Sequence, residues 1–204
     1  MELDFFRKMK VYDKVPRCMA SGHRIIKTRL VDTNKGDSER PHYRSRLLAK
    51  EIKSNVRLDV FAATPPLETM KMLLSMCAQA QARKRAYFYA PAMREVYVEI
   101  PVEDKLPCDE DKVARLRFSL YGTRDAAQNW QKTYTTHLVE LGFAVGRGSP
   151  CNFRHDVRDI SLTCHGDDFL IVAPHAELIW FEAAMKRKYE LKASRLGPEA
   201  GSLR

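Results

Sequence analysis

The segment Ile160–Val172 has the sequence ISLTCHGDDFLIV, and it decides the fold that we expect for this chain. Two apolar stretches flank the tetrapeptide His165-Gly166-Asp167-Asp168, so the pattern predicts two short strands joined by an acidic turn. Two adjacent carboxylates repel each other at such a turn, and a divalent cation would relieve that repulsion. An Asp-Asp turn can also expose both side chains to water, and the spacing alone leaves both interpretations open.

Helices are predicted on both sides of this segment. Residues Asp125–Leu141 place their apolar side chains on one helical face, and Gly142 supplies a stop signal. A last helix is predicted from the spacing of Leu178, Phe181, Met185 and Tyr189. The apolar face of the first helix consists of Ala126, Trp130, Tyr134, Leu138 and Leu141.

A third helix is predicted to begin at Thr64. Thr64 can cap it, Pro65 and Pro66 suit a first turn, and Glu68 favours the positive end of the helix dipole. Residues 78–82, AQAQA, are good helix formers, so this helix is expected to continue to about residue 85.

The remaining elements are strands. Residues 23–32 alternate basic and apolar side chains, a turn signal follows at residues 34–37, and residues 43–50 predict a second strand. Together they predict a basic hairpin. Residues 95–101, EVYVEIP, also alternate as a strand does. The mixture of helices and strands favours an α+β fold.

Positive charge is concentrated at the N-terminal end. The chain has 204 residues, a formal net charge of +9 and a pI near 9.4, and residues 1–57 contain 15 Lys and Arg against 7 Asp and Glu. Such an excess favours an anionic partner, with nucleic acid first and an anionic membrane surface second. A solvated basic face that keeps the protein soluble would have the same composition.

Cysteine use argues against a zinc site and a disulfide framework. The five cysteines form no CxxC pair, and no HxxxH motif accompanies them, which favours a reducing compartment. The charged N-terminus does not resemble a signal peptide, and no apolar run is long enough to span a membrane. We therefore expect an intracellular protein without a membrane segment.

Several segments, taken together and in order, resemble the reverse transcriptase domain of copia-type retroelements. The resemblance rests on six blocks that cover about residues 4–198, and the acidic turn is one of them. They are Tyr43–Lys50 (YRSRLLAK), Asp59–Pro66 (DVFAATPP), Ser119–Gly122 (SLYG) followed by Arg124, Ala126 and Trp130, Ser149–Cys151 (SPC), His165–Asp168 (HGDD), and Tyr189–Lys192 with Leu196-Gly197.

The resemblance implies a fingers–palm–thumb polymerase that copies RNA or DNA template-primers from deoxynucleoside triphosphates with two Mg²⁺ ions. By motif, Asp167 is implied as the main catalytic metal ligand of the acidic turn and Asp168 as its neighbour. No membrane partner is implied.

Five further residues are implied to bind the nucleotide. Arg44 and Arg46 would grip the triphosphate, because a planar guanidinium pairs bidentately with phosphate. Tyr87 would pack under the sugar, and Gly122 and Arg124 would lie near the template and the incoming base. A simpler interpretation is that Arg44 and Arg46 lie on a solvated strand face and that Tyr87 is an ordinary aromatic residue of the core.

The sequence departs from the family pattern at a decisive place. The family has a hydrophobic strand that ends in an aspartate five residues before the aromatic residue, and that count back from Tyr87 leads to Ala82. Because the residues before Ala82 look helical and polar, both a strand and its aspartate are expected to be missing, which would leave an incomplete palm sheet. The family glutamine of the SLYG block is Asp125 here, whose charge is expected to repel a triphosphate.

The predicted organisation is a basic fingers-like region at 1–64, a palm-like region at 65–175 with the acidic turn at 165–168, and a thumb-proximal helix and tail at 176–204, with little or no thumb. The leading hypothesis is an RNA-directed DNA polymerase domain that is inactive in this copy. The alternatives are a non-catalytic basic nucleic-acid-binding remnant, a decayed gene product and, more remotely, a metal-dependent nuclease.

Overall fold

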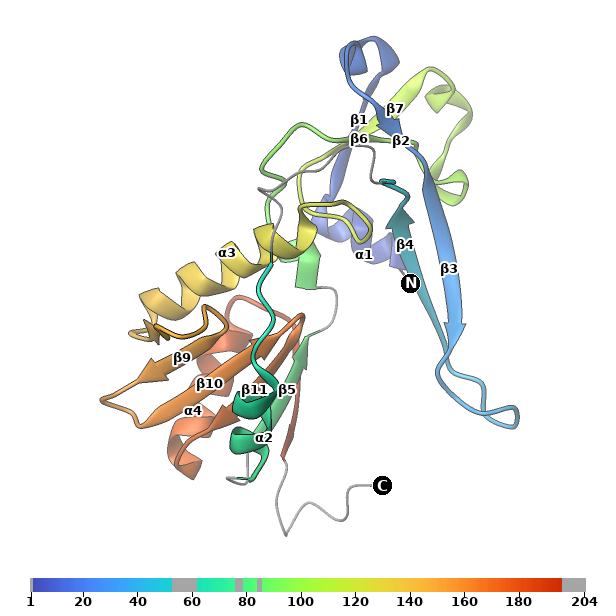
Figure 1. Ribbon diagram of the computed structural model, residues 1–204. Coiled ribbons are helices and arrows are strands. Elements are labelled where there is room, and N and C mark those ends of the chain that lie inside the picture. The colour runs from blue at the N-terminus through green and yellow to red at the C-terminus, as the bar shows by residue number, and fades with distance from the viewer. Residues whose placement is uncertain (1, 53–61, 76–78, 84–85, 196–204) are drawn as a thin grey trace. The chain divides into compact units, whose positions relative to one another are not determined.

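The computed structural model describes residues 2–52, 62–75, 79–83 and 86–195. The chain divides into two compact units, Met1–Phe61 with Tyr87–Trp130 and Ala62–Ala86 with Gln131–Arg204 (Figure 1). Within the described residues, no helix is both long and apolar enough to cross a membrane. The mixed helix and strand content confirms the predicted α+β character.

The first unit is built on a four-stranded sheet in the order β1-β7-β6-β2. The helix α1 (Glu2–Met9) packs against its core, where the Phe6 and Phe88 rings meet edge to face with centroids 4.5 Å apart. The strands are β1 (Tyr12–Pro16), β2 (Ile25–Ile26), β6 (Tyr97–Val98) and β7 (Lys112–Leu116), and short 3₁₀ helices occupy Arg17–Ala20, Ala86–Tyr89, Val102–Asp104 and Pro107–Asp109.

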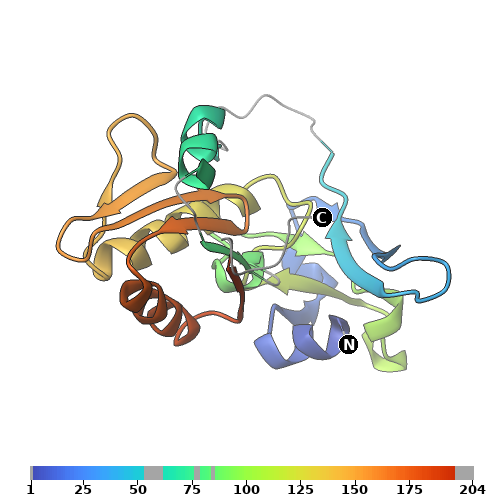
Figure 2. The ribbon, with the colours of Figure 1, turned by 90° about the horizontal axis from the view of Figure 1, so that it is seen from below.

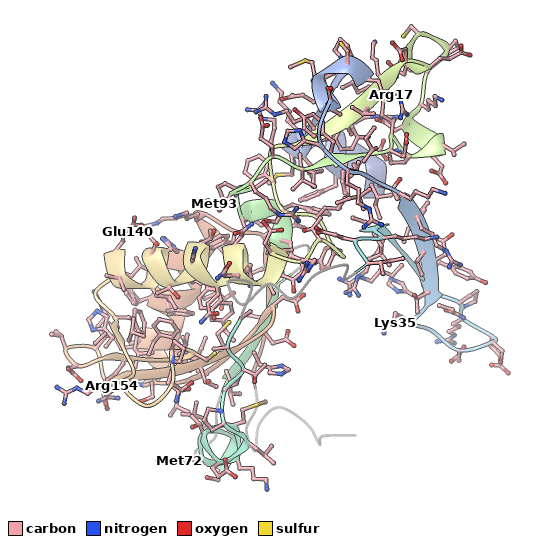
Figure 3. All side chains as sticks on the ribbon, turned by 45° about the horizontal axis from the view of Figure 1, so that its top comes forward. Arg17, Lys35, Met72, Met93, Glu140 and Arg154 are labelled. Carbon is pink, nitrogen blue, oxygen red and sulfur yellow. The ribbon has the colours of Figure 1, made fainter. Side chains whose placement is uncertain are left out.

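The predicted basic hairpin is confirmed. Strands β3 (Thr28–Asn34) and β4 (Tyr43–Ala49) pair antiparallel, and Lys35 lies at the far end of the hairpin (Figure 3). The first strand of this hairpin differs from the prediction. Residues 23–32 were expected to form one strand, but the structure divides them between β2 and β3. The predicted strand at 95–101 is shorter than expected, since only Tyr97–Val98 pairs with neighbours.

The second unit is built on a six-stranded antiparallel sheet in the order β12-β5-β11-β10-β9-β8. The hairpin predicted around the acidic turn is confirmed as β10 and β11. The strands are β5 (Gln79–Arg83), β8 (Ala144–Val145), β9 (Asn152–His155), β10 (Ile160–His165), β11 (Asp168–Val172) and β12 (Leu191–Arg195).

The expectation of a missing sheet strand is wrong. Residues Gln79–Arg83 form β5, which pairs with β11 on one side and β12 on the other. The predicted continuous helix is wrong for the same reason, because α2 (Leu67–Ser75) ends before this strand. Alternating glutamine and alanine form helices well in isolation, but pairing on both sides outweighs that weak preference. Residues 76–78 and 84–85 lie outside the described residues.

Two helices cover one face of the six-stranded sheet. In α3 (Ala126–Glu140) the Tyr134 ring packs on Phe153 and Phe169, and Phe181 of α4 (His175–Lys186) packs on Phe143. The helix α2 lies against β10 and β11 on the opposite side from α4 (Figure 2).

The predicted helix at 125–141 is confirmed, including its end. Gly142 has a φ of +94°, its N–H donates to Val139 O, and the Phe143 N–H donates to Leu138 O, which is the Schellman pattern. The last predicted helix is confirmed as α4, although the buried Tyr189 follows the helix instead of ending it.

The two units are discontinuous in sequence, whereas the regions predicted at 1–64, 65–175 and 176–204 are consecutive. The naming of those regions after polymerase subdomains stays a prediction. Two of the family-like segments fall partly outside the described residues, namely residues 59–61 and 196–197.

Candidate functional site

The acidic turn is the tip of the β10–β11 hairpin. His165 and Asp168 are paired across the strands, and Gly166 and Asp167 form the two-residue loop between them. Gly166 has a φ of +63°, and a glycine at the first loop position with positive φ fits a type II′ hairpin turn. The turn geometry therefore holds both aspartates at one end of a buried hairpin.

Electrostatics at this turn favour a neutralising partner. Partial desolvation, and then the neighbouring Asp167 carboxylate, raise the pKa of Asp168, while His165 acts in the opposite direction. The flanking residues Cys164 and Phe169 are buried, so the hairpin holds the two carboxylates close together at its tip.

Strand β5 lies directly beside the acidic turn. Ala82 is opposite Asp168 in the β5–β11 register, and directly opposed positions lie on the same face of an antiparallel sheet. Position 82 is also the position to which the family spacing leads from Tyr87. The structure thus places Ala82 directly opposite Asp168.

The residues at the turn do not fit a two-metal centre. Mg²⁺ is commonly held by one or two carboxylates with substrate phosphates, which Asp167 and Asp168 could supply for one ion. A second ion needs a further ligand, and among the described residues no group of three His, Cys, Asp or Glu side chains could hold a metal.

A second constellation, in the first unit, surrounds Tyr121. The Tyr87 ring lies 4.6 Å from the Tyr121 ring between centroids, and the Arg46 guanidinium carbon lies 5.4 Å from the Tyr121 centroid. Phe88, which is fully buried, meets the same ring edge to face at 5.6 Å. The structure therefore brings two predicted nucleotide-binding residues together around an aromatic residue that the sequence reasoning had not singled out. The position of Tyr121 in the SLYG block was the sequence signal that could have identified it.

Gly122 fits its position because of the neighbouring strand. Its φ is +85°, and a Cβ there would collide with the Ala49 carbonyl oxygen of β4. The Ala49 N–H donates to the Tyr121 carbonyl oxygen at 2.7 Å, so the turn is bonded to β4. On that strand Arg44 and Arg46 share one face, while Leu47 and Ala49 point into the core from the other.

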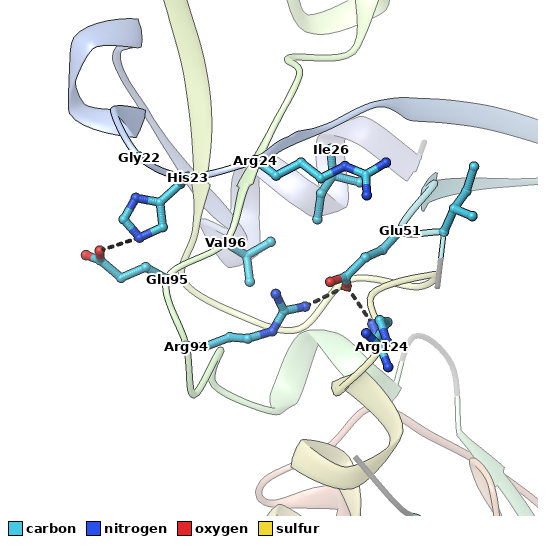
Figure 4. A pocket seen from close by; sticks show the side chains of 10 residues that line it. Gly22, His23, Arg24, Ile26, Glu51, Arg94, Glu95, Val96 and Arg124 are labelled. Atoms are coloured by element: carbon cyan, nitrogen blue, oxygen red, sulfur yellow. Dashed lines mark hydrogen bonds and ion pairs between the residues drawn. The ribbon is translucent and has the colours of Figure 1, made fainter. Parts of the chain in front are cut away.

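The expectation that Asp125 repels a triphosphate stays a prediction, although the structure gives this carboxylate partners within the fold. Asp125 is only 6% exposed, and its carboxylate accepts hydrogen bonds from Arg94 Nη2 at 2.9 Å and Asn129 Nδ2 at 3.2 Å. Arg94 Nη2 also donates to Glu51 Oε2 at 2.5 Å, and the backbone N–H of Arg124 donates to the same oxygen at 2.8 Å (Figure 4). The Arg94 guanidinium is thus shared between the carboxylates of Asp125 and Glu51.

The predicted site residues belong to two different units. Arg44, Arg46, Tyr87, Gly122 and Arg124 lie in the first unit, whereas Asp167 and Asp168 lie in the second. Sequence reasoning missed Tyr121, Arg94 and Glu51, which organise the first of these groups.

Comparison with known proteins gives one family over nearly the whole chain. Residues 9–198 match the family described as reverse transcriptase (RNA-dependent DNA polymerase). The chain is 24% identical over 212 residues to the retrovirus-related Pol polyprotein from transposon TNT 1-94 of Nicotiana tabacum. This match covers 97% of the chain and 16% of the tobacco protein. It is also 27% identical over 117 residues to the truncated transposon Ty1-A Gag-Pol polyprotein of Saccharomyces cerevisiae. That match covers 55% of the chain and 9% of the yeast protein. The chain therefore spans a small part of these relatives.

Proposed function

This chain belongs to the reverse transcriptase (RNA-dependent DNA polymerase) family and is a copia-type reverse transcriptase domain, and from that premise we propose that this copy is defective in nucleotidyl transfer. The observation that carries the proposal is the pairing of Ala82 with Asp168. A carboxylate at position 82 would lie beside the acidic turn, and alanine offers no ligand there.

The physical reason is loss of charge at the reacting phosphate. In two-metal phosphoryl transfer, paired ions stabilise the attacking and the leaving oxygen, and the carboxylates fix the positions of the ions. Losing one ligand weakens positioning and charge stabilisation together, which typically lowers rates by orders of magnitude. Asp167 and Asp168 alone would bind a single ion weakly.

Primer extension tests the proposal, with Ala82→Asp as the informative variant. Purified wild-type chain is expected to give no extension above background in Mg²⁺ or Mn²⁺. Ala82→Asp is expected to raise primer extension to at least about ten times the background level, because a missing metal ligand is restored. Ala82→Asn, which has nearly the same shape without the charge, is the matched control.

Measuring Mn²⁺ binding separates the effect of the missing metal-binding side chain at position 82 from other defects that would abolish synthesis. Mn²⁺ titrated into Ala82→Asp, followed by electron paramagnetic resonance, is expected to bind more tightly than to Ala82→Asn, and Asp167→Asn should abolish the gain. Robust, Asp167-dependent synthesis by the wild-type chain would contradict the proposal.

The remaining site roles are part of the same proposal. Arg44 and Arg46 would contact the triphosphate, Tyr87 the deoxyribose, and Gly122 and Arg124 the template and the incoming base. The shared face of the two arginines on β4 and the contact of Arg46 and Tyr87 with Tyr121 support this grouping.

A second candidate function is nucleic-acid binding without chemistry. It is favoured by the basic excess of residues 1–57 and by the hairpin that carries Arg29, Lys35, Arg44 and Arg46. Neutralising phosphates releases counterions, so gel-shift affinity is expected to fall steeply with salt. No shift of a single-stranded or duplex oligonucleotide at about 50 mM salt would remove this candidate.

A further inference from the structure

A cavity of about 320 Å³ in the first unit has a lining rich in arginine (Figure 4). Arg24, Arg94 and Arg124 line it, with Glu51 between the last two. The arginines come from three distant parts of the sequence: the segment before β2, the loop before β6 and the residues before α3. The fold therefore gathers cationic side chains that no sequence motif joins.

The Glu51 carboxylate is bound as an anionic ligand would be. Its Oε2 accepts from the Arg94 guanidinium at 2.5 Å and from the Arg124 backbone N–H at 2.8 Å, and its side chain is 12% exposed. A guanidinium and a backbone N–H close to the start of a helix are donors that proteins use for phosphate oxygens. Glu51 thus occupies a position that a phosphate oxygen could take.

The other carboxylates around the cavity also have partners, and some of these partners line the cavity themselves: Arg94 for Asp125 and His23 for Glu95. Glu95 accepts from Arg115 at 2.6 Å, and Asp125 accepts from Arg94 at 2.9 Å and from Asn129. These groups comprise four arginines, Arg24, Arg94, Arg115 and Arg124, and three carboxylates, Glu51, Glu95 and Asp125. Removing the Glu51 charge would raise the excess of arginines over carboxylates around the cavity from one to two.

We propose that this cavity is a phosphate-binding subsite for single-stranded nucleic acid, and that Glu51 closes it from within by taking the place of a phosphate. Displacement or neutralisation of Glu51 opens the subsite to a backbone phosphate, which then contacts Arg94, Arg124 and Arg24. The subsite shares Arg124 with the proposed template contact and rests on the proposed nucleic-acid binding, but it needs no chemistry at Asp167, so a loss of catalysis alone would leave it intact.

The test is binding of a fluorescein-labelled oligothymidylate, followed by anisotropy across a salt series. Glu51→Gln removes the charge with little change of shape and is expected to tighten binding about threefold to tenfold at 50 mM salt. One more neutralised phosphate should steepen the slope of log K against log salt by about 0.7 for a single strand. Glu103→Gln, an equal change of charge at an exposed residue of the same unit, should leave the slope unchanged.

A double variant and two small ligands complete the test. Arg24→Ala added to Glu51→Gln is expected to reverse most of the gain. Inorganic phosphate and deoxythymidine triphosphate are titrated as competitors. If they compete more strongly on Glu51→Gln than on wild type, the subsite accepts any phosphate group, and if only the oligonucleotide gains, it accepts backbone phosphate.

Two outcomes would overturn the proposal. One is a Glu51→Gln chain that melts cooperatively and binds no more tightly than Glu103→Gln. The other is failure of both Glu51→Gln and Glu51→Ala to melt cooperatively, since Glu51 would then be an ion-pair partner that the fold requires.

Discussion

At residue scale, Gly122 and Gly22 separate two causes of glycine preference. Both have a positive φ, +85° and +79°, but only Gly122 lies against backbone, while a Cβ at Gly22 would meet nothing within 4 Å. Gly148 has neither feature and provides a baseline. The three glycines therefore form a natural series for measuring strain and collision in one fold.

We expect the loss of unfolding free energy on substitution by alanine to increase from Gly148 through Gly22 to Gly122. Gly148→Ala should change it by less than about 0.5 kcal/mol. Gly22→Ala should lower it by about 1–2 kcal/mol through the left-handed backbone, and Gly122→Ala by about 3 kcal/mol or more, because the Ala49 carbonyl must also move. Urea unfolding measures all three, and equal losses at Gly22 and Gly122 would contradict a collision at β4.

At the scale of elements, β1 is joined to the 3₁₀ segment at Pro107–Asp109 by an ion pair between a partly exposed lysine and a buried carboxylate. Lys14 of β1 donates to the buried Asp109 at 2.7 Å, and Lys112 donates to the same carboxylate at 2.9 Å. The hydrogen bond from Lys14, then the one from Lys112, hold the pKa of Asp109 well below its usual range. This contact ties the loop to β1.

We expect this ion pair to make the first unit acid-sensitive. The folded-state pKa is depressed, so the stabilisation is complete above the unfolded pKa of about 4 and is lost as pH falls towards the folded value. Asp109→Asn should lower stability at pH 6 and flatten its dependence between about pH 2 and pH 5. Asp111→Asn, an exposed neighbour, is the control for urea unfolding across that range. A pH dependence unchanged by Asp109→Asn would contradict the assignment.

How far the sequence could predict these elements depends on where their partners lie. The helix α3 was predictable because its buried face repeats along its own sequence, and the β10–β11 hairpin because its partners are adjacent. Strand β5 was not, since Gln79–Arg83 has helix-forming composition and its partners β11 and β12 come much later in the chain. The period-two alternation of glutamine and alanine was the weak signal.

The candidate site divides in the same way. The Asp167-Asp168 turn was predictable as a local motif, and family spacing led to Ala82. The contacts of Tyr121 with Arg46 and Tyr87, and of Arg94 with Glu51 and Asp125, depend on tertiary packing, which no local pattern encodes.

At the scale of the whole molecule, two compact units each have a core of their own. Phe88 is fully buried in the first and Phe181 in the second, and the boundary between the units passes through α3 after Trp130. Units with separate cores often unfold in separate steps.

We therefore expect calorimetry to show two components that single variants move separately. Phe88→Ala should destabilise the first unit by about 3–5 kcal/mol, and Phe181→Ala should destabilise the second by a similar amount. Each variant should lower the midpoint of one component and leave the other close to its wild-type value. A single transition that both variants lower equally would show that the shared helix couples the units completely.

The central place of β5 in its sheet has a consequence for how the chain folds. Synthesis delivers β5 well before β11 and β12, so its backbone donors and acceptors wait for partners that arrive near the end. Closing such long loops is entropically costly, and topologies dominated by non-local pairing fold slowly. The β10–β11 hairpin can form early, whereas capture of β5 between β11 and β12 becomes the late step on which completion of the second unit depends.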